Sequence, residues 1–225
     1  MTPGFRVSNG WQRPDTPLIE VFKELPTAII SDNMHRLFAA GVSLRPIHRQ
    51  GTLCGSAFTV RTRPGDNLMV HKALDLAQPG DVIVVDAGGD TTNSIIGEIM
   101  WSYAKTRGIA GFVINGAVRD VAALSQGDLP VYALGATHRG PYKDGPGEIG
   151  TSVSIEGMII APGDIVVGDA DGVLAVPQAE ALAIAKLAKA QLDRETAIFR
   201  DIAAGTLDRS WVDATLTEKG LKAWV

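Results

Sequence analysis

An arginine and an aspartate, Arg119 and Asp120, stand side by side at the end of the segment GFVINGAVRD. The apolar run at 112–114 is typical of the end of a buried strand, and Asn115-Gly116 is typical of a turn that stops it. Open α/β sheets bind their ligands at the carboxyl ends of strands. The pair is therefore either a guanidinium and a carboxylate placed for chemistry, or a helix-start aspartate beside a solvated arginine.

A second candidate is the glycine-rich segment DAGGD at 86–90, which follows the apolar strand at 82–85 and precedes a predicted helix. Backbone amides in such a context can bind an anion. The segment lacks both the Gly-x-Gly-x-x-Gly fingerprint and the P-loop lysine, which argues against a nucleotide. The amides near GEIM at 97–100 could instead hold a carboxylate, and Gly97 would let a ligand approach the backbone closely.

The fold links these two signals. Two apolar strands that end at Val85 and Ile114 and run parallel would place both exits at the same edge of the sheet. We then expect Glu98, Arg119 and Asp120 to converge with backbone amides in one cleft. A guanidinium binds a carboxylate or keto acid through two hydrogen bonds, and a carboxylate can hold a largely hydrated Mg²⁺ ion. Such a set of groups could stabilise an enolate oxyanion.

The remaining candidates are weaker. His35, His48, His71 and His138 match no metal-ligand spacing such as His-Glu-x-x-His, so a structural role is favoured for each. Lys143, flanked by glycines in the segment GPYKDGPG, either contacts a ligand or is solvated, and the sequence leaves both open.

Composition excludes several classes of protein. The 225 residues carry a net charge of -4, which gives no general attraction for nucleic acid or an anionic membrane. The single cysteine, Cys54, allows neither an intrachain disulfide nor a cysteine-cluster zinc site. No signal peptide is evident in the first twenty residues, and no apolar run approaches the ~20 residues that cross a bilayer. We expect a soluble, cytoplasmic protein without nucleic-acid or membrane partners.

The order of predicted elements indicates a mixed α/β sandwich with an all-β portion. An irregular arm comes first, and a glycine- and proline-rich loop occupies 136–150. Helices are predicted at 18–25, 27–38 (ended by Gly41), 66–77, 94–106, just after Arg119, and 178–204, followed by a short amphipathic tail. Strands are predicted at 53–62, 82–85, 110–114, around 131, and at 152–156, 158–161, 165–168 and 172–176.

Several longer motifs occur together in one order: SDNMHRL (31–37), GDNLMVHKAL (65–74), GDVIVVDAGGD (80–90), GFVINGAVRD (111–120), RGPYKDGPGE (139–148) and PGDIVVGDADGVLAVP (162–177). Over about residues 18–205 the chain resembles the RraA-like proteins, which include divalent-metal 4-hydroxy-4-methyl-2-oxoglutarate aldolases. The resemblance implies a three-layer β/β/α swivelling-domain sandwich with extra N- and C-terminal helices. It also implies homotrimers or homohexamers with active sites at subunit interfaces.

The implied organisation has three parts. They are an N-terminal arm (1–17), the RraA-like α/β domain (18–177), and a C-terminal helical extension (178–225) that packs on the domain and on a neighbouring subunit.

The resemblance also assigns roles to residues. The aldolases carry an Asp, twenty residues, then Arg-Asp, and the matching positions here are Glu98, Arg119 and Asp120. By this resemblance Asp120 coordinates Mg²⁺ or Mn²⁺, and Arg119 grips the pyruvate part of the substrate. The pyruvate carboxylate would be held by the backbone of Gly97, Glu98, Ile99 and Met100. Glu195 falls where the aldolases bring an acidic residue from the neighbouring subunit to hold metal-bound water.

Two departures from the aldolase pattern bear on substrate identity. The first acid of the motif is the longer Glu98, and Ala123 stands where aldolases often have an acidic residue.

From the resemblance as a whole we expect a class II pyruvate aldolase for 4-hydroxy-4-methyl-2-oxoglutarate or a related hydroxy-oxo-acid, with oxaloacetate decarboxylase activity through a metal-stabilised enolate. The alternative is a regulator that binds and inhibits ribonuclease E. Such regulators tend to be shorter and to lack the aspartate that this chain keeps as Asp120.

Overall fold

The computed structural model describes residues 4–222 and separates the chain into two compact units. The first unit runs to Ala188 and the second begins at Lys189, so the division falls inside one long helix, α6 (Ala181–Ala204). Each unit is considered by itself.

Four parallel strands form the centre of the first unit's main sheet, in the order β3, β4, β6, β7. A helix follows each of the first three strands and leads to the next, which is the right-handed crossover arrangement expected of parallel strands. The strands are β3 (Leu53–Thr62), β4 (Asp81–Asp86), β6 (Gly111–Val118) and β7 (Val131–Ala136), and the helices are α3 (Leu68–Leu76), α4 (Glu98–Thr106) and α5 (Val121–Gln126).

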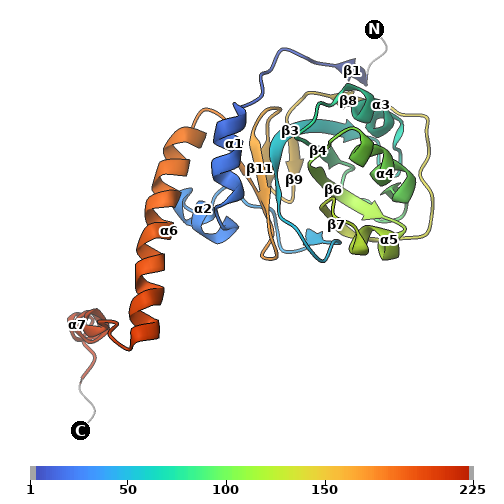
Figure 1. Ribbon diagram of the computed structural model, residues 1–225. Helices are drawn as coiled ribbons and strands as arrows, with labels where there is room; N and C mark the ends of the chain where they lie inside the picture. Colours follow the sequence, from blue (N-terminus) through green and yellow to red (C-terminus); the bar gives the residue numbers. More distant parts are fainter. Residues whose placement is uncertain (1–3, 223–225) are drawn as a thin grey trace. The chain divides into compact units, whose positions relative to one another are not determined.

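Shorter strands extend this sheet and build a second β layer (Figure 1). Those in the main sheet are β1 (Phe5–Val7), β2 (Arg45–Pro46), β5 (Ser94–Ile96), β8 (Gly147–Ile149), β11 (Ile165–Gly168) and β12 (Val173–Val176). A separate two-stranded sheet consists of β9 (Val153–Ile155) and β10 (Met158–Ile160). The remaining helices of this unit are α1 (Thr16–Lys23) and α2 (Thr27–Asn33).

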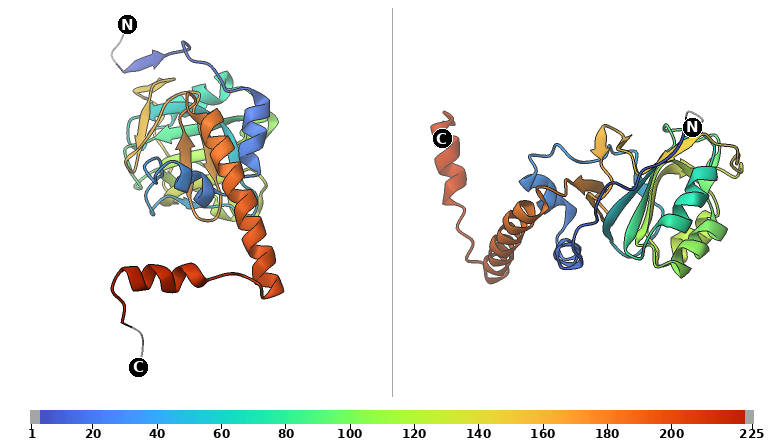
Figure 2. Two further views of the ribbon diagram at one scale, coloured as in Figure 1. Left: turned by 90° about the vertical axis from the view of Figure 1, so that its left-hand side faces the viewer. Right: turned by 90° about the horizontal axis from the view of Figure 1, so that it is seen from above.

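Two apolar cores hold three layers together. Alternate residues of β4 and β6 point to opposite faces. Ile83 and Phe112 belong to the core beneath α3, α4 and α5, whereas Val82 and Val113 belong to the core shared with β9, β10 and β12. Figure 2 shows the three helices on one side of the sheet and the short hairpins on the other. The predicted three-layer β/β/α sandwich is therefore confirmed.

The first two turns of α6 belong to the first unit. Its buried residues Ala181, Ile184, Ala185 and Ala188 recur at helical spacing. The second unit contains the rest of α6 and α7 (Ser210–Glu218). No helix in the described part of the chain is both long and apolar enough to span a bilayer. The predicted packing of the extension on a neighbouring subunit stays a prediction.

Most predicted elements are present, and the strands β3 and β4 lie where the sequence placed them. The turn at Asn115-Gly116 was wrong, because β6 continues through it to Val118. Pairing of residues 117 and 118 with both β5 and β7 supplies the hydrogen bonds that keep this stretch extended, and the register with β7 shifts after Ile114.

Three other boundaries were also wrong. The helix predicted at 27–38 ends at Asn33, because His35 and Arg36 adopt positive φ angles of 54° and 63°. The helix predicted from residue 94 begins at Glu98, after the strand β5. The arm is irregular except for residues 5–7, which form β1 and pair in parallel with β8.

Candidate active site

The segments that carry the candidate residues leave the sheet at a single edge. Because β3, β4 and β6 run parallel, their carboxyl ends lie together, as predicted for the strands ending near Val85 and Ile114. The chain after β3 supplies Asn67, the start of α4 supplies Gly97, and the exit of β6 supplies Arg119. This is the edge at which open α/β sheets bind ligands.

The exit of β6 is tied directly to the first turn of α4. The Glu98 amide donates a hydrogen bond of 2.9 Å to Asp120 Oδ2, and Arg119 Nε lies 3.7 Å from the same oxygen. The Arg119 amide donates to the Ile96 carbonyl at 3.0 Å. The structure thus brings together Glu98, Arg119 and Asp120, although Glu98 contributes its amide to this contact and its side chain is exposed.

Asp120 also has an unusual backbone. It precedes α5 in the left-handed conformation, with φ 56° and ψ 37°. Residues other than glycine adopt this conformation at a cost, although Asp and Asn tolerate it best. Such strained residues cluster at functional sites. The local conformation helps to present the carboxylate to the first turn of α4.

Gly97 is required at this contact for space. Its backbone is extended (φ -146°, ψ -167°), so any residue could adopt the conformation. A Cβ there would clash with Asp120 Oδ2 and would lie 2.8 Å from Arg119 Cγ and 2.9 Å from Arg119 Nε. The absence of a side chain therefore lets the Arg-Asp pair reach the helix amides.

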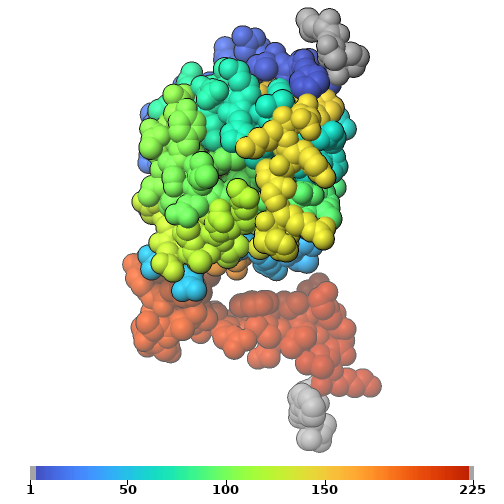
Figure 3. Space-filling view, turned by 90° about the vertical axis from the view of Figure 1, so that its right-hand side faces the viewer, coloured from blue at the N-terminus to red at the C-terminus, as the bar shows by residue number. Residues whose placement is uncertain are grey.

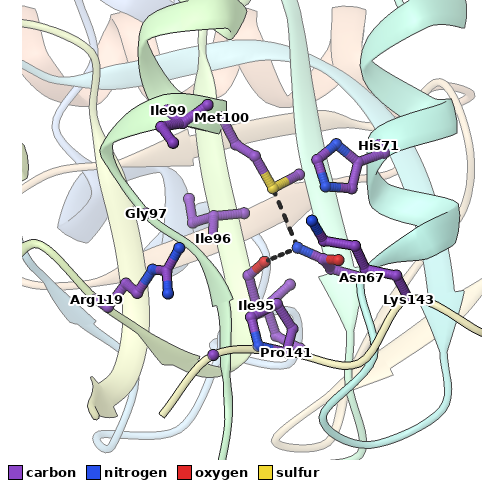
Figure 4. Close-up of a pocket in the computed structure, with 11 residues that line it drawn as sticks. Asn67, His71, Ile95, Ile96, Gly97, Ile99, Met100, Arg119, Pro141 and Lys143 are labelled. Carbon is purple, nitrogen blue, oxygen red and sulfur yellow. Dashed lines mark hydrogen bonds between the residues drawn. The ribbon is translucent and has the colours of Figure 1, made fainter. Parts of the chain in front are cut away.

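A cavity of about 210 Å³ opens beside Arg119. Its middle is apolar, with Ile95, Ile96, Ile99 and Met100 among the lining residues. In Figure 4, Arg119 lies on the opposite side from a polar wall formed by Asn67, His71 and Lys143. A first helical turn has N–H groups without intrahelical carbonyl partners, so the amides of Ile99 and Met100 are suited to an anion here.

Two polar residues of this wall come from α3 and its start. Asn67 is buried, and its Nδ2 donates to the Ile95 carbonyl at 2.9 Å. The pKa of His71 is lowered, first by burial and then by the Lys143 ammonium group, against the opposing effect of Asp75. His71 is therefore favoured in its neutral form near pH 7. The structural role favoured for His71 did not place it at this cavity, and for Lys143 contact with a ligand or solvation had both been left open. Both residues lie far from Arg119 along the chain, so the sequence pattern did not show that the three line one cavity.

Asp120 faces a second, open hollow of about 500 Å³, which Arg119, Val121, Thr137 and His138 also line. Arg119 therefore borders both hollows. The side chain of Asp120 is 43% exposed, so a hydrated ion could approach it.

The donor set fits a hard divalent cation better than zinc. Within residues 4–222 no cluster of three or more His, Cys, Asp or Glu side chains could enclose a metal. Mg²⁺ is commonly held by only one or two carboxylates and keeps several waters, whereas a zinc site needs at least three protein ligands. Asp120 could supply the one direct carboxylate. Glu195 lies in the second unit, where its Oε1 accepts a 2.8 Å hydrogen bond from Gln191.

Comparison with known proteins agrees with this architecture. The sequence model of the RraA-like family, described as Aldolase/RraA, matches residues 27–175. The chain therefore belongs to the RraA-like family. It is 42% identical over 190 residues to a Halalkalibacterium halodurans protein named "Putative 4-hydroxy-4-methyl-2-oxoglutarate aldolase", covering 83% of this chain and 90% of that protein.

Solved structures show the same fold. An uncharacterized protein from Pseudomonas syringae pv. tomato superposes with a TM-score of 0.79 at 26% identity, covering 88% of this chain and 97% of that one. The RNA-processing inhibitor RraA from Thermus thermophilus superposes with a TM-score of 0.63 at 30% identity, covering 68% and 92%. The family thus includes an inhibitor as well as a protein named as an aldolase.

Proposed function

We propose that this protein is a divalent-metal-dependent lyase that releases pyruvate from 4-hydroxy-4-methyl-2-oxoglutarate or a related hydroxy-oxo-acid, and that also decarboxylates oxaloacetate. The observation that carries the proposal is the junction of Arg119, Asp120 and the first turn of α4 across Gly97. The similarity to a relative named as an aldolase supports the same reaction.

The proposed roles follow from charge and position. The amides of Ile99 and Met100 bind the carboxylate of the 2-oxo acid, and the Arg119 guanidinium donates to its oxygen atoms. Asp120 would hold Mg²⁺ or Mn²⁺ on the side facing the open hollow. When bound, such a cation supplies positive charge beside the 2-oxo group, where negative charge develops during the reaction.

Cleavage then needs one proton removed and one returned. The carboxylate of Glu98, directly or through a water, accepts the proton of the 4-hydroxyl group. As the new carbonyl forms, the bond between C3 and C4 breaks, and its electron pair passes to the pyruvate enolate. Arg119 stabilises the enolate oxygen, and protonation at C3 completes pyruvate. Loss of CO₂ from oxaloacetate gives the same enolate, so one site serves both reactions.

The test is pyruvate release by the purified protein, with and without EDTA, from oxaloacetate and from 4-hydroxy-4-methyl-2-oxoglutarate. We expect release that EDTA abolishes, that Mg²⁺ or Mn²⁺ restores, and that Asp120→Ala removes. If neither these substrates nor related hydroxy-oxo-diacids give metal-dependent pyruvate, the proposal is wrong.

Assembly as a homotrimer or homohexamer forms part of the proposal, because the hollow beside Asp120 is open in a single chain. A neighbouring subunit would bring Glu195 toward the metal-bound water. Glu195→Gln, expected to be weakly active, and Asp120→Ala, expected to be inactive, should regain activity when the two proteins are mixed and allowed to exchange subunits. Without such complementation, Glu195 would have no role across an interface.

The similarity to the Thermus thermophilus inhibitor supports a second candidate, a regulator that binds ribonuclease E. Binding to purified ribonuclease E, measured for the wild-type protein and Asp120→Ala, separates the two functions. A regulator would bind and inhibit the nuclease whether or not Asp120 is present. An enzyme of the proposed kind would lose pyruvate release in the variant and show no such binding.

A further inference from the structure

The loop that carries Lys143 is fastened to the start of α3 by a buried carboxylate. Asp66 is fully buried, and its Oδ2 accepts hydrogen bonds from the amides of Asp144 (2.8 Å) and Gly145 (2.9 Å). Its Oδ1 accepts from the Leu68 amide at 2.9 Å. One carboxylate thus binds backbone on both sides of the junction between the loop and the helix.

Backbone pairing fixes the same junction on the other side of Lys143. The Tyr142 amide donates to the Gly65 carbonyl at 2.8 Å, and the Asn67 amide donates to the Tyr142 carbonyl at 3.0 Å. Lys143 therefore lies between two anchored positions. Figure 3 shows the yellow loop crossing the surface beside the teal and green elements. A glycine-rich loop would otherwise be free to move, so these bonds set where Lys143 stands.

The anchored lysine gives the cavity a second cationic end. Arg119 and Lys143 both line it, apolar side chains lie between them, and none of the described residues that line it is acidic. No ion pair joins Lys143 to any carboxylate within residues 4–222. Two cations across an apolar middle are complementary to a small molecule with a carboxylate at each end.

We propose that Lys143 binds the distal carboxylate of a diacid substrate and that Asp66 is the positioning residue that holds it there. The inference rests on the proposed function and adds a selectivity to it: hydroxy-oxo-diacids over the matching monoacids. Asp66 is fully buried and is not among the residues that line the cavity, so it acts through the loop.

A substitution at Asp66 can be nearly isosteric. Asp66→Asn replaces one carboxylate oxygen by an NH₂ group, which cannot accept a hydrogen bond from a backbone N–H. If the NH₂ group takes the place of Oδ2, the amides of Asp144 and Gly145 lose their acceptor; if it takes the place of Oδ1, the Leu68 amide loses its acceptor. Asp164→Asn is the matched control. Asp164 is also buried and accepts from two backbone amides, those of Ala161 (2.7 Å) and Gln178 (3.1 Å), but it does not line the cavity.

The experiment compares full-length proteins loaded with Mg²⁺ on 4-hydroxy-2-oxoglutarate and on 4-hydroxy-2-oxopentanoate, in which a methyl group replaces the distal carboxylate. Pyruvate, which has no distal group, serves as a competitive inhibitor. Lys143→Met should raise KM for the diacid by about 10- to 100-fold, as expected for loss of a charged hydrogen bond. The inhibition constant of pyruvate should change by less than about 3-fold, because the groups at the Arg119 end are intact.

Asp66→Asn should shift the diacid-to-monoacid ratio of kcat/KM in the same direction, whereas Asp164→Asn should leave that ratio unchanged. Lys143→Arg should retain part of the preference. The inference is overturned if Lys143→Met leaves the diacid KM unchanged, or weakens diacid and pyruvate equally, or if the two Asp→Asn variants behave alike. Failure of the proposed function is distinguishable, because the wild-type protein would then release no metal-dependent pyruvate from any of these substrates.

Discussion

Gly97 offers the sharpest test of the site, because one methyl group should disable it without unfolding the protein. An alanine Cβ would overlap Asp120 Oδ2 and would lie within 2.9 Å of two Arg119 side-chain atoms. The backbone at Gly97 is extended, so the substitution introduces no conformational strain. The side chains of Arg119 and Asp120 are 39% and 43% exposed, so they can swing outward to relieve the overlap.

The expected effects on activity and stability differ widely. A displacement of about 1 Å at a catalytic group can lower the rate by about 10²-fold, so we expect at least that loss in kcat/KM for Gly97→Ala. The cost to folding is replacement of a glycine N-cap by alanine, roughly 0.5–1 kcal/mol. In a chain of this size, 1 kcal/mol lowers Tm by only about 2–4 °C.

The assay follows pyruvate release from oxaloacetate at saturating Mg²⁺, with Tm measured on the same samples. Gly135→Ala is the matched control, since a Cβ at Gly135 meets nothing within 4 Å. It should keep activity within about 2-fold, as surface substitutions usually do. Wild-type activity in Gly97→Ala would show that the reaction does not need this contact, and the site would have to lie elsewhere.

Three further predictions concern stability and protonation. Arg13→Ala should lower the free energy of unfolding by about 3 kcal/mol, measured by urea denaturation, because it leaves the buried Asp81 carboxylate without two 2.7 Å charged hydrogen bonds. Asp120→Gly should unfold about 2–4 °C above Asp120→Ala by calorimetry, because only glycine adopts the left-handed conformation without cost. Burial raises the pKa of Cys54 to about 12, so its thiol should react with a disulfide reagent at pH 8 only after denaturation.

Each of these has a contrasting outcome. Arg6→Ala removes an exposed ion pair with Glu148 and should lower the free energy of unfolding by less than about 1 kcal/mol. If Arg6→Ala and Arg13→Ala lower it equally, the buried ion pair does not stabilise the fold more than the exposed one. Equal Tm values for Asp120→Gly and Asp120→Ala would show that the left-handed backbone at this position is not strained. Rapid labelling of native Cys54 would show that α1, whose Ile19 carbonyl lies 3.5 Å from the thiol sulfur, leaves it accessible.

The fold could be predicted from the sequence largely because its strands are apolar and continuous. The runs at 53–62 and 82–85 are flanked by turn residues and have no competing interpretation. Errors arose where tertiary contacts override local preference. Asn115-Gly116 is a strong turn signal, yet strands on both sides hold it extended. The apolar spacing through Leu37 suggested a longer helix, whereas Leu37 is 73% exposed beyond the end of α2.

The candidate site was predictable only in part. Arg119, Asp120 and Gly97 stand at strand exits, and parallel strands bring such exits together, so their meeting follows from the pattern. The role of Asp66 could not be foreseen, because an aspartate before a helix is usually an N-cap. Its side chain does accept from the first turn of α3, but the loop amides that it also binds lie 78 and 79 residues later.

The two ends of the cavity, at Arg119 and at Lys143, are built from different segments of the chain. The Arg119 end is built from the β6 exit and α4, and Gly97 makes that contact close. The Lys143 end is built from the loop after β7, which is joined to the start of α3 by the Asp66 carboxylate and by the backbone hydrogen bonds of Tyr142. The two ends meet at β5, where the Ser94 amide and hydroxyl donate to the Arg139 carbonyl of the loop and the Ile96 carbonyl accepts from the Arg119 amide. Lys143 lies further along the loop than this contact, so a substitution at Lys143 alters the group facing the far end of a substrate while leaving the Arg119 end intact. Substrate choice can therefore vary separately from the chemistry.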